Sequence, residues 1–291
     1  MICSREGMRE SAHGTKRGED DGASSGFERA GIWGNFGMGM ITDSLIEEFR
    51  EVGYFVTPPI FSRAQLDAVA AEFDRLWNEY IRQAEAQGDA KQIGIARDRP
   101  FIGQIHTRSA LCAEFVKSSI YLEACARLIG PDADLYYNQA VIKPPERGRH
   151  FGWHQDSGYT TTEPLEYVTC WTAISRSFIE NGCIWVLPGS HRQGVLPHAY
   201  NEQERSTDAP VEDESGAIPV EMEAGQVAIF SSLLLHKSGP NTSGEIRHGF
   251  VPQYHHPGAI LVSSGKPWGD QYPVLRGGRR WDGDDAARKR D

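Results

Sequence analysis

Two side chains that can bind a metal lie close together in the segment FGWHQDSGY, namely His154 and Asp156. If this segment is a β-strand, residues i and i+2 point to the same side, so the imidazole and the carboxylate can reach one ion. One further histidine would complete the set of two histidines and one carboxylate that non-haem Fe(II) oxygenases use. A His-x-Asp pair is also common as a simple surface hydrogen bond, so its interpretation depends on the residues downstream.

A histidine and an arginine follow at suggestive spacings. The run VAIFSSLLLHKSGPN reads as an apolar strand that ends on His236, whose imidazole would need a partner. Eleven residues later Arg247 opens another strand-like run, and a planar guanidinium can hold a carboxylate through two parallel hydrogen bonds. Taken alone, His236 would be a core histidine and Arg247 part of a surface ion pair. Together with the His-x-Asp pair, they favour a metal site with an anion beside it.

The elements that must position these residues divide the chain into three parts. Residues 1–38 are rich in Gly, Ser and charge and are expected to form an unstructured tail. Residues 39–291 are expected to form one domain, with roughly the last 15 residues frayed. Its first part is helical, and strands dominate after Pro131.

Helix signals are clearest before Pro131. A capping box predicts a short helix from Ser44 to just before Gly53, and a second capping box predicts a longer helix from Ser62 to near Gly88. The longer helix has apolar residues on one face, which indicates packing against a core. A third helix is expected over 119–128.

Short strand-like runs alternate with Gly and Pro turns in the second part of the chain, a pattern typical of a sandwich or barrel. The expected strands cover 134–143, 167–176, 183–188, 226–235 and 246–254. A segment rich in Glu, Asp and Ser at about 199–217 interrupts them and is interpreted as a mobile surface insertion or a lid.

Composition excludes several classes of protein. The formal net charge of -10 argues against a nucleic-acid surface, and no apolar run is long enough to span a membrane. The five cysteines form no Cys-x-x-Cys pair, so neither a disulfide framework nor a zinc ribbon is expected. With no secretory signal recognised, a cytoplasmic protein is the default expectation.

Most of residues 40–254 resembles the phytanoyl-CoA dioxygenase family of Fe(II)/2-oxoglutarate-dependent oxygenases. The helical start EEFREVGYFVTPPIFSRAQLDAV is similar to the opening of that family. The motifs that carry the resemblance are NQAVIKPP, WHQD, CWTAIS, NGCIWVLPGSH and LLHKSGPNTSGEIR. The resemblance implies a mainly β protein with flanking helices, built on a double-stranded β-helix, the jelly roll of cupins.

The resemblance also implies roles for individual residues. It assigns Fe(II) to His154, Asp156 and His236, and the far carboxylate of 2-oxoglutarate to Arg247 with support from Ser238. Two further contacts to this cosubstrate are implied, an aromatic one from Trp171 and a polar one from Gln139.

With O2, such a site would oxidise a small-molecule metabolite, most simply by hydroxylation, and decarboxylate 2-oxoglutarate to succinate. Asp156 fills the position that halogenating relatives leave to chloride, which favours hydroxylation over halogenation. Epimerisation, desaturation and ring closure by the same kind of site stay open. A role in secondary metabolism is expected from family analogy alone.

Other histidines are given lesser roles. His191, in PGSHR, is expected to be structural, and His248 should point to the opposite face from Arg247. His255 and His256 are adjacent and would face apart, so they make a poor metal pair.

Three other functions are considered. A cupin-type metal-binding protein or isomerase would keep the three ligands but would not need Arg247 and Ser238. A barrel that has lost activity would not need intact ligands. A zinc hydrolase would need a general base beside the metal, and the sequence has no His-Glu-x-x-His segment.

Overall fold

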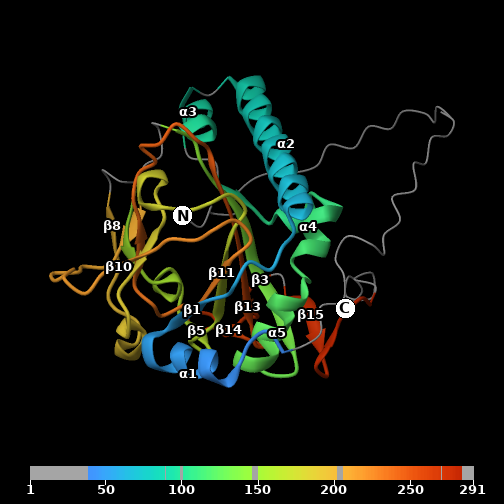
Figure 1. Cartoon of the computed structure of the whole chain (residues 1–291), viewed down its shortest axis with the longest axis vertical. Helices are drawn as coiled ribbons and strands as arrows, with labels where there is room; N and C mark the ends of the chain where they lie inside the picture. Colours follow the sequence, from blue (N-terminus) through green and yellow to red (C-terminus); the bar gives the residue numbers. More distant parts are fainter. Residues whose placement is uncertain are drawn as a thin grey trace, which may run out of the picture.

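Two antiparallel sheets pack face to face, and helices cover the outside of the larger sheet (Figure 1). The computed structural model describes residues 39–88, 90–98, 101–145, 150–201, 206–269 and 271–283. The tail expected over 1–38 lies outside these residues. The expected jelly roll with flanking helices is confirmed.

The larger sheet has the strand order β1-β11-β6-β13-β3-β15-β16, and β2 also pairs with β3. The smaller sheet has the order β10-β7-β12-β4, and two short pairs lie outside both sheets, β5 with β14 and β8 with β9. The strands are β1 (Tyr54–Val56), β2 (Phe101–Gly103), β3 (Ala133–Lys143), β4 (Phe151–His154), β5 (Thr162–Glu163), β6 (Val168–Ala173), β7 (Ile184–Val186), β8 (Ala199–Asn201), β9 (Ser206–Asp208), β10 (Ile218–Val220), β11 (Val227–Ser231), β12 (His236–Ser238), β13 (Arg247–His255), β14 (Ile260–Leu261), β15 (Tyr272–Arg276) and β16 (Arg279–Arg280).

The helices lie mainly in the first half of the chain. They are α1 (Asp43–Val52), α2 (Arg63–Gln87), α3 (Ala90–Asp98), α4 (Ala110–Phe115) and α5 (Ser119–Leu128), with short 3-10 turns η1 (Ile105–Thr107), η2 (Asp156–Gly158), η3 (Ile179–Asn181) and η4 (Ser190–Gln193). Among the helices of the described residues, none combines the length and apolar character needed to cross a membrane.

Two apolar clusters account for the layers. The larger cluster joins α1, α2, α4 and α5 to the outer face of the larger sheet through residues such as Phe73, Phe115 and Phe250. The second cluster lies between the two sheets, where Trp171 of β6 and Val186 of β7 are both buried. Alternate residues of the same strand enter the two clusters, as the two-residue period of a strand requires.

The helix predictions hold with one change. α2 begins after the capping box of Ser62 and ends at Gly88, whose left-handed backbone suits glycine. α5 covers the expected residues. The first helix is capped by Thr42 and not by Ser44, because the Thr42 hydroxyl accepts a hydrogen bond from the N–H of Leu45. α3 and α4 were not predicted.

The strand expected over 226–235 is wrong in its second half. β11 ends at Ser231, and His236 begins β12 in the other sheet. Ser231 turns the chain, since its hydroxyl accepts from the N–H of Leu233 and its carbonyl from the N–H of Leu234. Serine side chains compete with strand ladders in this way.

The segment expected to be a surface insertion packs against the barrel where it is described. β8 and β9 form a hairpin, and the N–H of Ala209 donates to the carbonyl of Trp153 in β4. Ala209 and Trp153 share an apolar cluster with Leu235. Residues 202–205 lie outside the described part, and a role as a lid stays a prediction.

Two short strands lie near the C-terminal end of the described residues. β15 pairs with β3, and β16 pairs with β15. Arg280 of β16 reaches Glu114 at 2.6 Å, which ties this hairpin to α4. Residues 284–291 lie outside the described part, and the fraying expected for the last 15 residues stays a prediction.

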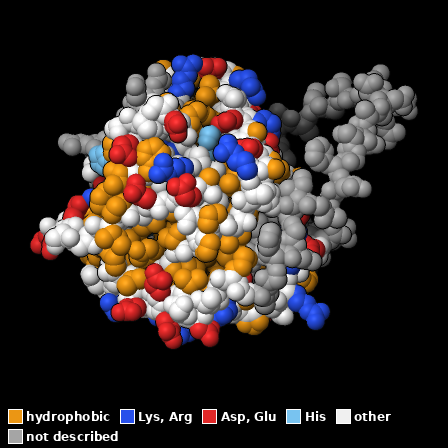
Figure 2. All heavy atoms as spheres, in the orientation of Figure 1, with side chains coloured by type: hydrophobic (Ala, Val, Ile, Leu, Met, Phe, Trp, Pro, Cys, Tyr) orange, Lys and Arg blue, Asp and Glu red, His pale blue; other side chains and the backbone are white. Residues whose placement is uncertain are grey.

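Hydrophobic side chains form several patches on the face shown in Figure 2, with acidic and basic side chains scattered among them. No broad area of Lys and Arg covers the described residues of this face. Such an area is what a nucleic-acid surface would need. The expectation that the protein does not bind nucleic acid stays a prediction.

A buried carboxylate holds the start of the domain. Glu123 of α5 is 4% exposed, and its two oxygens accept from the backbone N–H groups of Gly39, Met40 and Ile41. Hydrogen bonds to a charged group are stronger than neutral ones. Glu123 thereby fixes where the chain enters the fold, just before α1.

Substituting Glu123→Gln should lower the free energy of unfolding by about 1.5–3 kcal/mol, because an amide group would face N–H donors. Urea unfolding followed by circular dichroism measures this. The matched control is Glu114→Gln, whose half-exposed ion pair with Arg280 should contribute less than about 1 kcal/mol. Equal losses in both variants would contradict an anchoring role for Glu123.

Candidate active site

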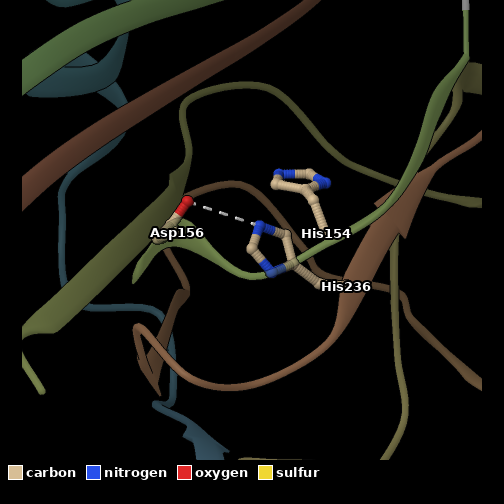
Figure 3. Close-up of side chains that lie close together, drawn as sticks. All are labelled: His154, Asp156 and His236. Atoms are coloured by element: carbon tan, nitrogen blue, oxygen red, sulfur yellow. Dashed lines mark ion pairs between the residues drawn. The ribbon is translucent and has the colours of Figure 1, made fainter. Parts of the chain in front are cut away.

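Three side chains of the types that bind metals converge at one end of the barrel interior. One ligand atom each from His154, Asp156 and His236 can be chosen so that all lie within 4.8 Å of one another. Figure 3 shows the two imidazoles side by side with the carboxylate facing His236. His154 ends β4 and His236 begins β12, and the two residues are direct partners across these strands.

The convergence of His154 and Asp156 does not arise as expected from a strand. β4 ends at His154, and Asp156 begins the 3-10 turn η2. The carboxylate is therefore brought back toward the imidazoles by a turn. The prediction that the two side chains meet survives, but the strand alternation used to reach it is wrong.

Backbone carbonyls fix both imidazoles. Nδ1 of His154 lies 2.9 Å from the carbonyl oxygen of Gly152, and Nδ1 of His236 lies 2.9 Å from that of Leu234. A carbonyl can only accept, so each Nδ1 carries a proton, and in a neutral ring Nε2 then keeps its lone pair. Histidine ligands are commonly oriented by such a bond from the second ring nitrogen.

Burial sets the charge of His154. It lowers the pKa of this imidazole well below its ordinary value, and the neighbouring His236 lowers it further. Neutral imidazole is the form that binds a metal. At neutral pH His154 is thus ready to donate its lone pair without first losing a proton.

The carboxylate of Asp156 is held by the other sheet. Thr169 of β6 donates its hydroxyl proton to Oδ2 of Asp156 at 2.6 Å. Oδ1 lies 3.8 Å from Nε2 of His236. One oxygen is therefore bound by the protein, and the other faces the histidines.

Gln155, between the two candidate ligands, is fully buried and ties several segments together. Its amide nitrogen donates to the carbonyls of Gly194 and Leu233, and its amide oxygen accepts from the N–H of Leu196. Its backbone N–H donates to Nε2 of His198. The His-x-Asp segment is thus fixed from both sides by residues far away in sequence.

Arg247 is buried, so the surface ion pair considered from the sequence is wrong. It is 1% exposed, and its Nη1 donates to the carbonyl of Gly182 at 2.7 Å. Its Nε is buried and makes no hydrogen bond with the described residues. Burial lowers the pKa of Arg247 to about 10, so the guanidinium stays cationic at neutral pH. A buried cation with an unused donor is suited to an anionic ligand.

Trp171 borders this cation, and Ser238 is bonded to Lys143, the strand partner of Arg247. The guanidinium carbon of Arg247 lies 5.1 Å from the centre of the Trp171 ring, a distance that allows a cation–π interaction. Gly249 permits this packing, because a Cβ there would come within 2.7 Å of the indole. The Ser238 hydroxyl accepts from Nζ of Lys143 at 2.9 Å.

Lys143 is a functional candidate that sequence reasoning missed. It is 2% exposed and is the direct partner of Arg247 across β3 and β13. Its place in the segment NQAVIKPP gave no signal of burial, which depends on the strand pairing. Gln139 lies on the same face of β3, opposite Val251, and is half-buried.

Three other histidines lie elsewhere, as the sequence indicated. Nε2 of His191 contacts the carbonyl of Arg50, and His248 pairs with Asp74 of α2 on the outer face of the larger sheet. His255 packs among aromatic rings that include Tyr136 and Trp268. His191, His248 and His255 do not join the three converging side chains.

A cavity of about 430 Å³ lies beside the smaller sheet. Ser238 borders it, and its lining includes three larger side chains, those of Trp153, Trp185 and Lys237. Each of these alternates along its strand with a residue that faces the barrel interior, so the three point to the outer face. This cavity is therefore not where the two histidines and the carboxylate meet.

Comparisons with known proteins agree with this geometry. A family model described as phytanoyl-CoA dioxygenase matches residues 49–249. A probable phytanoyl-CoA dioxygenase from Caenorhabditis elegans is 26% identical over 226 residues, which cover 71% of this chain and 72% of that protein.

Two solved structures extend the comparison. The non-haem monooxygenase ThoJ in its apo form is 28% identical, with a TM-score of 0.62 over 84% of this chain and 91% of that one. EvdO2 from Micromonospora carbonacea var. aurantiaca, complexed with 2-oxoglutarate, is 23% identical, with a TM-score of 0.61 over 80% and 98% of the two chains. The EvdO2 likeness shows the fold alone.

A jelly roll that gathers two imidazoles and one carboxylate, and that also buries Arg247 with an unused donor, has the features of the non-haem oxygenases that depend on Fe(II) and 2-oxoglutarate. Since the family model covers well over half of the sequence, the chain belongs to the phytanoyl-CoA dioxygenase family. The donor atoms and the buried Arg247 fit Fe(II), 2-oxoglutarate and O2 as the cofactor set.

In the metal-free protein His154 should be a neutral Nδ1–H tautomer at neutral pH, and Nδ1 of His236 should also carry a proton. Because its folded-state pKa is depressed, His154 should stay neutral below pH 6.5, where an unfolded histidine takes up a proton. Stability should therefore fall as the pH drops below 6.5. Long-range ¹H–¹⁵N NMR measures the tautomer and the protonation of each ring, with His154→Ala as the assignment control. An Nε2–H tautomer for either residue would contradict the geometry.

Proposed function

We propose that His154, Asp156 and His236 bind Fe(II), that Arg247 binds the far carboxylate of 2-oxoglutarate, and that the protein hydroxylates a small-molecule metabolite. The observation that carries this proposal is one interior that holds both the converging donor atoms and the buried cation. Family analogy suggests a substrate from secondary metabolism.

The protein's own residues would bind and orient the reactants. The two Nε2 lone pairs and Oδ1 of Asp156 would hold the ion, with each ring kept in place by a backbone carbonyl. Arg247 would neutralise the dianionic cosubstrate and fix its direction. Trp171 would cover the cosubstrate with an apolar surface that excludes water, and Ser238 and Gln139 would add polar contacts.

Bound Fe(II), 2-oxoglutarate and O2 supply an oxidative decarboxylation to succinate and CO2 that is coupled to oxidation of a substrate C–H bond. Asp156 supports hydroxylation over halogenation, since its carboxylate takes the position that chloride would need. The side chains of Arg247 and Trp171 keep the cosubstrate end of the barrel closed, as both are almost fully buried.

An anaerobic titration tests the cofactor assignment. Apo-protein given Fe(II) and then 2-oxoglutarate should develop a weak visible absorption band from the chelated cosubstrate, and His154→Ala should lose it. His248→Ala is the matched control, because His248 lies on the outer face of the sheet. Iron binding without a band would instead favour a cupin-type metal-binding protein or isomerase.

Replacing Arg247 should affect the cosubstrate and not the metal. Arg247→Ala should weaken 2-oxoglutarate binding by roughly 10–100-fold, the size expected for a buried charge-assisted contact, with Fe(II) affinity nearly unchanged. Calorimetry with each ligand measures both.

A monocarboxylate 2-oxo acid provides the control for that experiment. It lacks the far carboxylate, so the wild type should bind it weakly and Arg247→Ala should bind it no worse. Loss of metal and cosubstrate together would show that the substitution disrupts the fold, and unchanged 2-oxoglutarate affinity would exclude the assigned role.

A further inference from the structure

The two histidines and the aspartate of the candidate site are held by different sheets. His154 on β4 and His236 on β12 belong to the smaller sheet. Asp156 follows β4 in a 3-10 turn, and its carboxylate accepts a hydrogen bond from Thr169 on β6 of the larger sheet. The position of the carboxylate relative to the imidazoles thus depends on a contact between the sheets.

A second hydrogen bond fixes the direction of the first. Nε2 of Gln253 donates to the hydroxyl oxygen of Thr169 at 3.3 Å. Gln253 and Thr169 are direct partners across β13 and β6, and both are buried. An amide nitrogen can only donate, so the Thr169 oxygen accepts from Gln253 and its one proton goes to Asp156.

This arrangement leaves the two carboxylate oxygens unequal. Oδ2 of Asp156 accepts the Thr169 proton at 2.6 Å, a length typical of a bond to a charged acceptor. Oδ1 lies 3.8 Å from Nε2 of His236 and faces the histidines. A carboxylate held in this way offers one oxygen to an ion, which leaves more coordination positions for other ligands.

We propose that Thr169, with its hydroxyl oriented by Gln253, is the positioning residue that fixes Asp156 as a ligand through one oxygen. The inference rests on the proposed metal site and deepens it. Thr169 does not touch the metal or the substrate in this role. It acts through Asp156, as outer hydrogen-bond partners of metal ligands commonly do.

A nearly isosteric pair of variants tests the inference. Thr169→Val removes the hydroxyl that holds Asp156. Thr172→Val makes the same change on the same strand, but Thr172 faces the helices and its hydroxyl bonds to Tyr121 at 2.6 Å. Both side chains are almost fully buried, so the two variants should lose similar stability in thermal unfolding.

Of these two variants, Thr169→Val alone should alter metal binding. Calorimetry of apo-protein with Co(II) should show affinity weakened by about 10–100-fold, and the visible Co(II) spectrum should change because Oδ2 becomes free to bind. Thr169→Ser should keep the wild-type Co(II) affinity and spectrum, since it keeps the hydroxyl. Gln253→Leu should give a smaller weakening of the same kind, because Thr169 still has its proton to donate.

The outcomes separate this inference from the proposed function. A wild-type protein that binds no Co(II) would overturn the metal site and the inference with it. If the wild type binds Co(II) but Thr169→Val matches it in affinity and spectrum, the site stands and the role of Thr169 is excluded. If Thr169→Val does not fold, Gln253→Leu provides the test. An unchanged Co(II) affinity and spectrum in that variant would exclude the proposed effect of Gln253 on Asp156 through Thr169.

Discussion

The pairing of β4 with β12 is the constraint on which the candidate site depends. It makes His154 and His236 direct partners, so both rings point into the barrel from neighbouring strands. Their ring centres lie 4.1 Å apart. Because each Nδ1 is bound by a carbonyl two residues earlier in its own segment, the strand that places each ring also selects its tautomer.

The larger sheet supplies positively charged side chains to the interior that it shares with the smaller sheet. Arg247 and Lys143, partners across β13 and β3, place two buried cations in the interior, and Thr169 on β6 reaches across to Asp156. Metal-binding groups thus come from the smaller sheet and its connections, and the cations come from the larger one. This division explains why both sheets must pack correctly before the site exists.

Local chemistry made several elements predictable. The capping box at Ser62 and the turn residue Gly88 act within one helical turn, so α2 could be bounded from sequence. The break after Ser231 was missed because apolar residues stand on both sides of the two serines, so that the whole run resembled one strand. The 3-10 turn of the His-x-Asp segment was also missed, and the segment was assigned to a strand. This turn is held by contacts with distant residues such as His198 and Gly194, which no local pattern indicates.

The sequence by itself determined the residue types that can bind a metal and an anion, their order and spacing, and membership of the family. These are properties of short motifs, which keep their chemistry in any surroundings. Only the tertiary structure decided that Arg247 is buried, that Lys143 is its neighbour, and that Thr169 bonds to both Asp156 and Gln253. Those facts depend on which strands pair. Arg247 and Lys143 are 104 positions apart, and Gln253 and Thr169 are 84 positions apart, which is beyond the reach of any local pattern.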